Sequence, residues 1–243
     1  GLNFTAATQT EVSLTAVRID VAAANAVAVS MMSPSRLRIF MSHFEFTGGG
    51  VNPSTALVLG DKGGGGALGA EVAVVQNVIN AFVSSGISIY SSNFELQLNQ
   101  ISMAGATSSG ITVLGGSFSG AISDNDVFGT HQISYNIAGL NNGTDRTTDI
   151  AILGNRATGP GNQGVLFSGF VQNSRIMGNV IDGWLGGPEV TATGIQLSTN
   201  VDNCPGNVEV SENQVVRCSD GISVIGFYDT RARSDISVDN FAN

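Results

Sequence analysis

Apolar and polar residues alternate in short runs along this chain, which is the pattern of strands with one buried face. Six runs share one form: an apolar residue, two variable residues, asparagine, one variable residue and a second apolar residue. Their asparagines are Asn77, Asn99, Asn125, Asn155, Asn179 and Asn213. A seventh run, around Asn240, has Ser237 in place of the first apolar residue. Successive asparagines are 22, 26, 30, 24, 34 and 27 residues apart, so the repeat has a variable length.

A second element, made of glycine, an apolar residue, a variable residue and an apolar residue, alternates with the first. It begins at Gly86, Gly110, Gly164, Gly194 and Gly221. Between Gly110 and Gly164, Gln132 is expected to take the glycine position. The second element starts 7 to 15 residues after each asparagine. Each repeat therefore holds at least two short strands, and asparagine and glycine between them tolerate the left-handed conformation of a tight corner.

One such repeat cannot bury its inner face alone, but stacked repeats pair their strands in parallel and close a common core. Asparagines at the same corner can then form a ladder of side-chain amides. The sequence predicts an all-β, single-stranded parallel β-helix of roughly eight or nine coils. A β-sandwich lacks a fixed period of this kind, and propeller blades have longer ones.

The solenoid is expected to cover residues 36–243 as one domain. Residues 1–35, with the Ala-rich stretch from Ala22 to Met32, are expected to form an N-terminal cap or an early coil. The last repeat ends at Ala242 without a capping segment after it. Because a bare terminal coil exposes strand edges and core, we expect the chain to be a fragment of a longer protein.

The repeat resembles that of the right-handed, pectate-lyase-like β-helix proteins, which include polysaccharide lyases, epimerases, hydrolases and phage tailspikes. The resemblance covers Val72 to the C-terminus and, less closely, Arg36 to Leu59. It implies a polysaccharide partner, a location outside the cell or on a virion surface and, as in tailspikes, a homotrimer. An outward stripe including Tyr90, Leu114 and Ile225 agrees with a partner of this kind. The Asp-Pro-His-Asp motif of the epimerases is missing, and Asn142-Gly-Thr-Asp145 matches the hydrolase motif only in part.

Composition restricts the partners further. The formal net charge is −9, which opposes binding to a phosphate backbone, so no nucleic-acid partner is expected. No apolar run approaches the ~20 residues of a membrane span. Cys204 and Cys218 either form a disulfide or remain two thiols. No metal site and no cofactor is expected, since the sequence has no second pair of cysteines and no cluster of histidines. Ca²⁺ is the open alternative, although no motif indicates it.

The longest insertion, residues 182–193, is the strongest candidate for a site. It holds Asp182, the only tryptophan Trp184, and Glu189. The same corner holds Arg156 one coil earlier, and Arg217 and Asp220 one coil later. We expect Asp182, Glu189 and Asp220 to be catalytic, and Trp184, Arg156 and Arg217 to bind substrate.

The chemistry of these residue types explains the choice. An aromatic ring stacks on a sugar, and arginines bind it with paired hydrogen bonds. Two carboxyls at about 5–9.5 Å suit a glycoside hydrolase. A lyase would instead use a base and an arginine that neutralises a uronate. The alternative is that these residues have only structural roles: the tryptophan would pack its loop against the solenoid, and the acids would cap turns.

A second candidate is the acid pair Asp124 and Asp126, with Asp149 in the following coil. His131 lies near this pair, as a proton shuttle or as a surface hydrogen-bonding residue. The overall expectation is a protein that binds and cleaves a polysaccharide, as a tailspike-like depolymerase or a lyase. The alternative is a non-catalytic shaft or adhesin segment, which the missing catalytic motifs favour.

Overall fold

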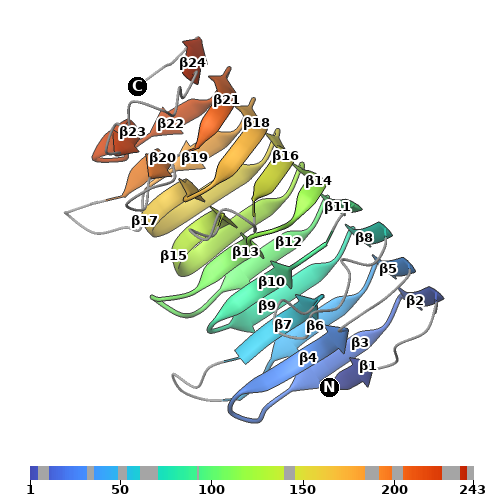
Figure 1. Cartoon of the computed structure of the whole chain (residues 1–243). Helices are drawn as coiled ribbons and strands as arrows, with labels where there is room; N and C mark the ends of the chain where they lie inside the picture. Colours follow the sequence, from blue (N-terminus) through green and yellow to red (C-terminus); the bar gives the residue numbers. More distant parts are fainter. Residues whose placement is uncertain are drawn as a thin grey trace.

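The computed structural model describes residues 1–4, 11–31, 36–48, 54–60, 71–91, 93–139, 146–183, 192–198, 205–225 and 236–239. These residues form short strands that wind into a stack of coils, with the N- and C-terminal ends at opposite ends of the stack (Figure 1). All strand pairs are parallel, and the described residues contain no helix. The predicted all-β parallel solenoid is confirmed.

Each coil has three sides, which we name by their strands. The nine-stranded face contains β2 (Glu11–Thr15), β5 (Arg36–Phe40), β8 (Glu71–Val75), β11 (Asn93–Gln97), β14 (Phe118–Ser123), β16 (Thr147–Leu153), β18 (Val171–Met177), β21 (Gly206–Ser211) and β24 (Ile236–Asp239). The post-asparagine face contains β3 (Arg18–Val21), β6 (His43–Phe46), β9 (Val78–Phe82), β12 (Gln100–Met103), the first parts of β15 (Asp126–Ala138) and β17 (Arg156–Ser168), β19 (Val180–Asp182) and β22 (Gln214–Val216).

The third side is the glycine face. It contains β1 (Leu2–Phe4), β4 (Ala26–Met31), β7 (Ser54–Leu59), β10 (Ser85–Ile89), β13 (Ser109–Val113), the second parts of β15 and β17, β20 (Thr193–Ser198) and β23 (Asp220–Ile225). The first strands continue the same pattern, because β2, β3 and β4 pair with β5, β6 and β7. The chain before residue 36 is thus an early coil wherever the structure describes it.

The predicted asparagine ladder runs through the stack at one corner. In each coil the side-chain Oδ1 accepts hydrogen bonds from the backbone N–H and the Nδ2 of the preceding asparagine, as Asn99 Oδ1 does from Asn77 at 3.1 and 2.9 Å. The Nδ2 also donates to a carbonyl of the coil before, such as Ile39 O at 3.0 Å from Asn77. The same contacts continue through Asn125, Asn155, Asn179 and Asn213. Ser42 begins the ladder by donating its backbone N–H to Asn77.

The left-handed conformation belongs to the residue before each ladder asparagine, and not to the asparagine as expected. Gln76, Leu98 and Asp124 have φ values of 58°, 56° and 55°. Gly154 and Gly178 take the same place in later coils, with φ values of 62° and 64°. The ladder asparagine does not adopt this conformation, and its amide forms hydrogen bonds with the neighbouring coils. The left-handed turn position before it can therefore be occupied by other residue types.

The repeated glycines exist because the next coil leaves no room for a side chain. A Cβ atom on Gly110 would lie 2.4 Å from the side chain of Val127, and a Cβ on Gly164 would lie 2.4 Å from that of Ile181. The strand register places Ser134 in this column, so the expected alignment at Gln132 is wrong by two residues. The column glycines face Ile or Val of the next coil, and in the coil after Ser134 the strand position of these residues is held by Ala157. The smaller partner makes the serine side chain tolerable.

Candidate functional site

Of the residues predicted to form a site at the corner that contains Asp182, only some lie together in the structure. Asp182 ends β19, and Arg217 follows β22 in the next coil. The Arg217 Nε donates to Asp182 Oδ1 at 2.8 Å, and its Nη2 contacts Oδ2. Asp182 is 8% exposed and therefore nearly buried beneath the arginine. Both oxygens of this predicted catalytic acid are engaged by a predicted substrate-binding residue.

The other predicted residues of this corner are more dispersed. Arg156 lies on the same face, one coil earlier, as the strand partner of Val180 and Asp126. Asp220 begins β23 on the glycine face and is exposed. Trp184 and Glu189 lie outside the residues that the structure describes. The structure therefore brings together Asp182 and Arg217, places Arg156 near them along one face, and separates Asp220.

Asp126, from the second candidate site, is the neighbour of Arg156 in the outward column of the post-asparagine face. Its Oδ1 is buried and has no hydrogen-bond partner among the described residues. Burial raises the pKa of Asp126, and the positive charge of Arg156 partly offsets this effect. The result is a half-buried carboxyl beside an exposed guanidinium.

His131 is not a surface residue, and it is buried at 1% exposure. Its Nδ1 lies 2.9 Å from the Gly129 carbonyl, which can only accept, so Nδ1 carries the proton. Its Nε2 lies 2.7 Å from Ser134 Oγ and accepts that hydroxyl's hydrogen bond. Burial lowers the pKa of His131 to about 4, so the ring is neutral at pH 7. The pair fills the core where this coil lacks a glycine, and a role in shuttling protons to the surface has no support.

The remaining chemical groups are few in the part of the chain that the structure describes. Cys218 is a free thiol whose pKa burial raises, and Cys204 lies outside the described residues. Within those residues no group of three or more His, Cys, Asp or Glu side chains is placed to hold a metal ion. The described part also has no helix long and apolar enough to cross a membrane.

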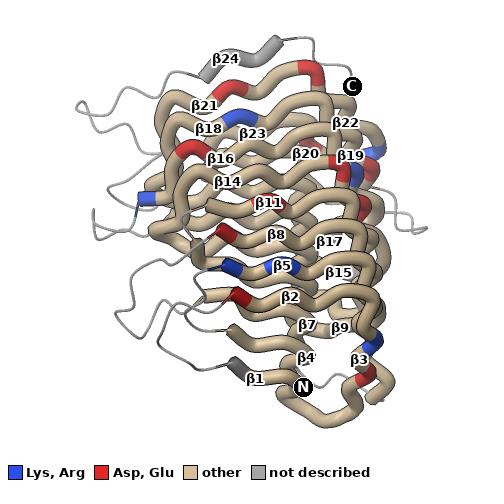
Figure 2. Tube along the Cα trace, turned by 90° about the vertical axis from the view of Figure 1, so that its right-hand side faces the viewer, with Lys and Arg blue, Asp and Glu red and all other residues tan. Residues whose placement is uncertain are grey.

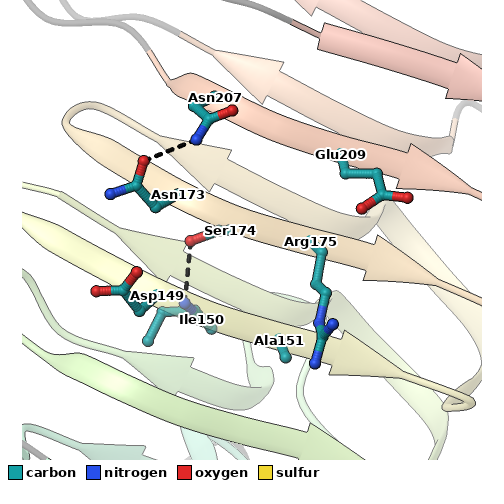
Figure 3. A pocket seen from close by; sticks show the side chains of 8 residues that line it. All are labelled: Asp149, Ile150, Ala151, Asn173, Ser174, Arg175, Asn207 and Glu209. Atoms are coloured by element: carbon teal, nitrogen blue, oxygen red, sulfur yellow. Dashed lines mark hydrogen bonds between the residues drawn. The ribbon is translucent and has the colours of Figure 1, made fainter.

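A groove on the nine-stranded face was not expected. It is open, has a volume of about 350 Å³, and crosses β16, β18 and β21 (Figure 3). Its lining residues are Asp149, Ile150, Ala151, Asn173, Ser174, Arg175, Asn207 and Glu209. Figure 3 shows Asp149, Asn173 and Asn207 along one side and Arg175 and Glu209 along the other.

Local backbone geometry sets the first side of the groove. Asp149, Asn173 and Asn207 have φ values of 58°, 50° and 51°, a left-handed kink repeated in three coils. The kink interrupts the regular pairing, and Ser174 Oγ compensates by accepting from the Ile150 N–H at 3.0 Å. Asn207 Nδ2 donates to Asn173 Oδ1 at 2.8 Å, which forms a short outer ladder. Asp and Asn suit this position because they adopt the left-handed conformation at low cost.

The second side of the groove carries charge. Arg175 and Glu209 are strand partners and both are exposed. In Figure 3 the Arg175 guanidinium extends toward Ala151, away from Glu209. No ion pair of Arg175 is found among the described residues, whereas Arg18, Arg36 and Arg217 all pair with acids.

The sequence contains a further repeated position that marks this groove. Asp149, Asn173 and Asn207 each precede a ladder asparagine by six residues. Ser119, six residues before Asn125, has the same conformation with φ of 53°. A polar residue at this fixed offset marks the outer kink, and only Asp149 among the lining residues was singled out beforehand.

Comparison with known proteins adds no relative. No family model matches this chain, and neither the curated proteins nor the solved structures gave a match to it. Its function must therefore be argued from the geometry of these two surfaces.

Proposed function

We propose that this protein binds a polysaccharide on the outside of the solenoid, in the groove over β16, β18 and β21. The observation that carries the proposal is the groove itself, which is lined by polar side chains from three successive coils. The proposal includes kinship with the pectate-lyase-like proteins, which the asparagine ladder supports, and a location outside the cell or on a virion surface.

The donors and acceptors of the groove suit sugar hydroxyls, which are both donors and acceptors. Asp149 and Glu209 accept, Arg175 donates, and Asn173 retains its Nδ2 donors. All four side chains project from strands, and fixing the exposed Arg175 and Glu209 on binding costs about 0.5–1.5 kcal/mol each. Successive coils repeat about every 4.8 Å, so a polymer along the solenoid axis would meet equivalent positions in turn.

A binding titration tests this site. The variant Arg175→Ala should lose about tenfold or more in affinity, because a charged hydrogen bond contributes roughly 1.5–3 kcal/mol. Arg38→Ala is the matched control, since Arg38 lies on the same face in β5 and projects outward like Arg175. A panel of neutral and uronate-containing polysaccharides supplies the ligands. Equal losses in the two variants, or no binding by the parent protein, would contradict the proposal.

Cleavage is a further part of the proposal, and it belongs to the post-asparagine face. Asp126 is the carboxyl there best suited to hold a proton, because burial raises its pKa, and Arg156 beside it can bind an anionic sugar. Asp182 on this face, Glu189, and Asp220 on the adjoining glycine face remain proposed catalytic acids, with Trp184 and Arg217 as substrate-binding residues. Reducing ends without new double bonds would indicate a hydrolase, and absorbance from new double bonds would indicate a lyase.

A non-catalytic shaft or adhesin segment is the second candidate function. The observation that favours it is the pairing of both Asp182 oxygens with Arg217, which leaves this acid engaged. Folded protein that binds a polysaccharide without releasing reducing ends or double bonds from any substrate would support this candidate.

A further inference from the structure

One outward residue of the post-asparagine face differs from its mostly polar neighbours. The strand register aligns Asp20, Glu45, Asn80, Ser102, Phe128, Thr158, Asp182 and Val216 in one column. Phe128 is half-buried, and it is the only Phe, Tyr or Trp that points outward from the described strands of this face. Its strand partners, Ser102 and Thr158, have short side chains, and part of the aromatic ring reaches solvent between them.

The backbone directly after Phe128 is irregular. Gly129 has a φ of 99°, and the pairing of β15 with β17 shifts register between Phe128 and His131. A Cβ atom on Gly129 would lie 2.5 Å from the Met103 carbonyl oxygen, so no larger residue fits there. Irregularities of this kind bend a strand, re-aim the side chains beside them and are common next to binding sites. Phe128 therefore lies at a bend, with no side chain immediately beyond it.

Charged and polar groups border the ring. Figure 2 shows acids and arginines gathered near β19 and, separately, near β3 at the other end of this face. Asp126 lies two residues before Phe128 and on the same side of the strand, about 6.6 Å away along it. Arg156 is the strand partner of Asp126, as Thr158 is of Phe128. The ring thus has a carboxyl, a guanidinium and two hydroxyls around it.

The carboxyl of Asp126 has an unmet hydrogen bond. Its Oδ1 is buried and receives no hydrogen bond from the described residues. A buried acceptor without a donor costs free energy, so a ligand hydroxyl that donates to this carboxyl would be favoured. The exposed guanidinium of Arg156 supplies donors for the acceptor atoms of the same ligand.

A sugar ring suits these groups better than a purely apolar ligand. The faces of a pyranose carry C–H bonds, which pack on an aromatic ring, and its rim carries hydroxyls that both donate and accept. An apolar side chain or a lipid tail would desolvate Asp126 and Arg156 without giving them partners. We propose that Phe128 is the stacking platform of a sugar subsite on the post-asparagine face, where Asp126 and Arg156 bind the polar rim of the stacked sugar.

This inference rests on the proposed polysaccharide binding and adds a contact that the groove does not supply. The groove lies on the nine-stranded face, whereas Phe128 lies on the next face, beyond the asparagine ladder. The platform also gives the proposed cleavage a positioning residue, because a sugar stacked on Phe128 is held beside the Asp126 carboxyl.

Calorimetric titration with oligosaccharides of polygalacturonate, alginate and a neutral β-glucan tests the platform. For the oligosaccharide that binds best, Phe128→Ala should lose roughly three- to tenfold in affinity, and Phe128→Tyr, which keeps the ring, should stay within about twofold of the parent. Phe40→Ala is the matched control, because Phe40 also points outward and is half-buried, but it ends β5 on the nine-stranded face. Circular dichroism checks that each variant is folded.

The outcomes separate the platform from the groove. Full affinity in Phe128→Ala, an equal loss in Phe40→Ala, or a loss that Phe128→Tyr fails to restore would overturn the platform. Binding that falls in Arg175→Ala but not in Phe128→Ala would keep the groove and remove the platform. Binding that falls in Phe128→Ala alone would keep the platform and remove the groove. A folded parent that binds none of the oligosaccharides would overturn both.

Discussion

Replacing Asn125 by alanine should remove one rung from the middle of the ladder. Its Oδ1 accepts from the backbone N–H and the Nδ2 of Asn99, at 3.0 and 2.9 Å. Its Nδ2 donates to Leu96 O at 2.8 Å and to Asn155 Oδ1 at 3.0 Å. Alanine makes none of these bonds, and Asn125 is 1% exposed, so water does not replace them.

The magnitude follows from which groups lose every partner. The Asn99 N–H keeps no acceptor, and an unpaired buried donor costs about 1–3 kcal/mol. The other three bonds each contribute about 1 kcal/mol. The free energy of unfolding should therefore fall by about 4–6 kcal/mol, a large part of the 5–15 kcal/mol typical of a folded protein. Urea denaturation followed by circular dichroism measures this change.

Asn93→Ala is the control, because Asn93 is an exposed strand residue of the nine-stranded face in the coil before. It should change the free energy of unfolding by less than about 0.5 kcal/mol. A loss of under about 1 kcal/mol in Asn125→Ala would show that the ladder bonds add no net stability, contrary to this prediction.

The variant Asn125→Asp separates hydrogen bonding from shape. Aspartate keeps the acceptor for Asn99, but its second oxygen faces the oxygens of Leu96 and Asn155. Only the protonated carboxyl can donate there, so the folded state should bind this proton above the unfolded pKa of about 3.9. The variant should therefore be least stable at pH 7 and should gain stability relative to the parent as the pH falls toward 4.

Three further predictions concern the core and the corner. Burial lowers the pKa of His131 to about 4 in the folded state, against 6.5 in the unfolded state. The free energy of unfolding should therefore fall by about 3 kcal/mol as the pH drops from 6.5 to 4. In urea titrations, His131→Gln should abolish this pH dependence. Ala157→Val should cost about 1–3 kcal/mol by overpacking against Ser134, and Ser134→Gly in that background should recover part of the loss. Arg217→Gln should cost about 1 kcal/mol, because it removes the ion pair with Asp182, which solvent screens in part because Arg217 is half-exposed, and an unchanged thermal midpoint would contradict the pairing.

The fold can be predicted from the sequence because each ladder asparagine, which contacts residues of other coils, lies in a short motif that is visible in the local sequence. Asn77 and Asn99 are in contact although they are 22 positions apart, and each lies in a recognisable pattern of apolar residues. The error at Gln132 has a physical cause. The frame there lacks glycine, and only the strand pairing, which puts Tyr135 opposite Ile111 and Val165, shows where the strand is registered.

The candidate site was less predictable, because its geometry depends on neighbours in other coils. The sequence placed Asp182 and Arg217 at one corner, but it could not show that they would bind each other. Arg175 received no attention, since an isolated arginine in a strand has no sequence signature. Its significance depends on Asn173, Asn207 and the kink that they share.

A crystal structure of the protein with an oligosaccharide from the polysaccharide that it binds best would locate the sugar-binding surface. We expect sugar units over β16, β18 and β21, with hydrogen bonds to Asn173 and Arg175. Sugar bound on the post-asparagine or glycine face, with the groove empty at saturating ligand, would contradict this expectation.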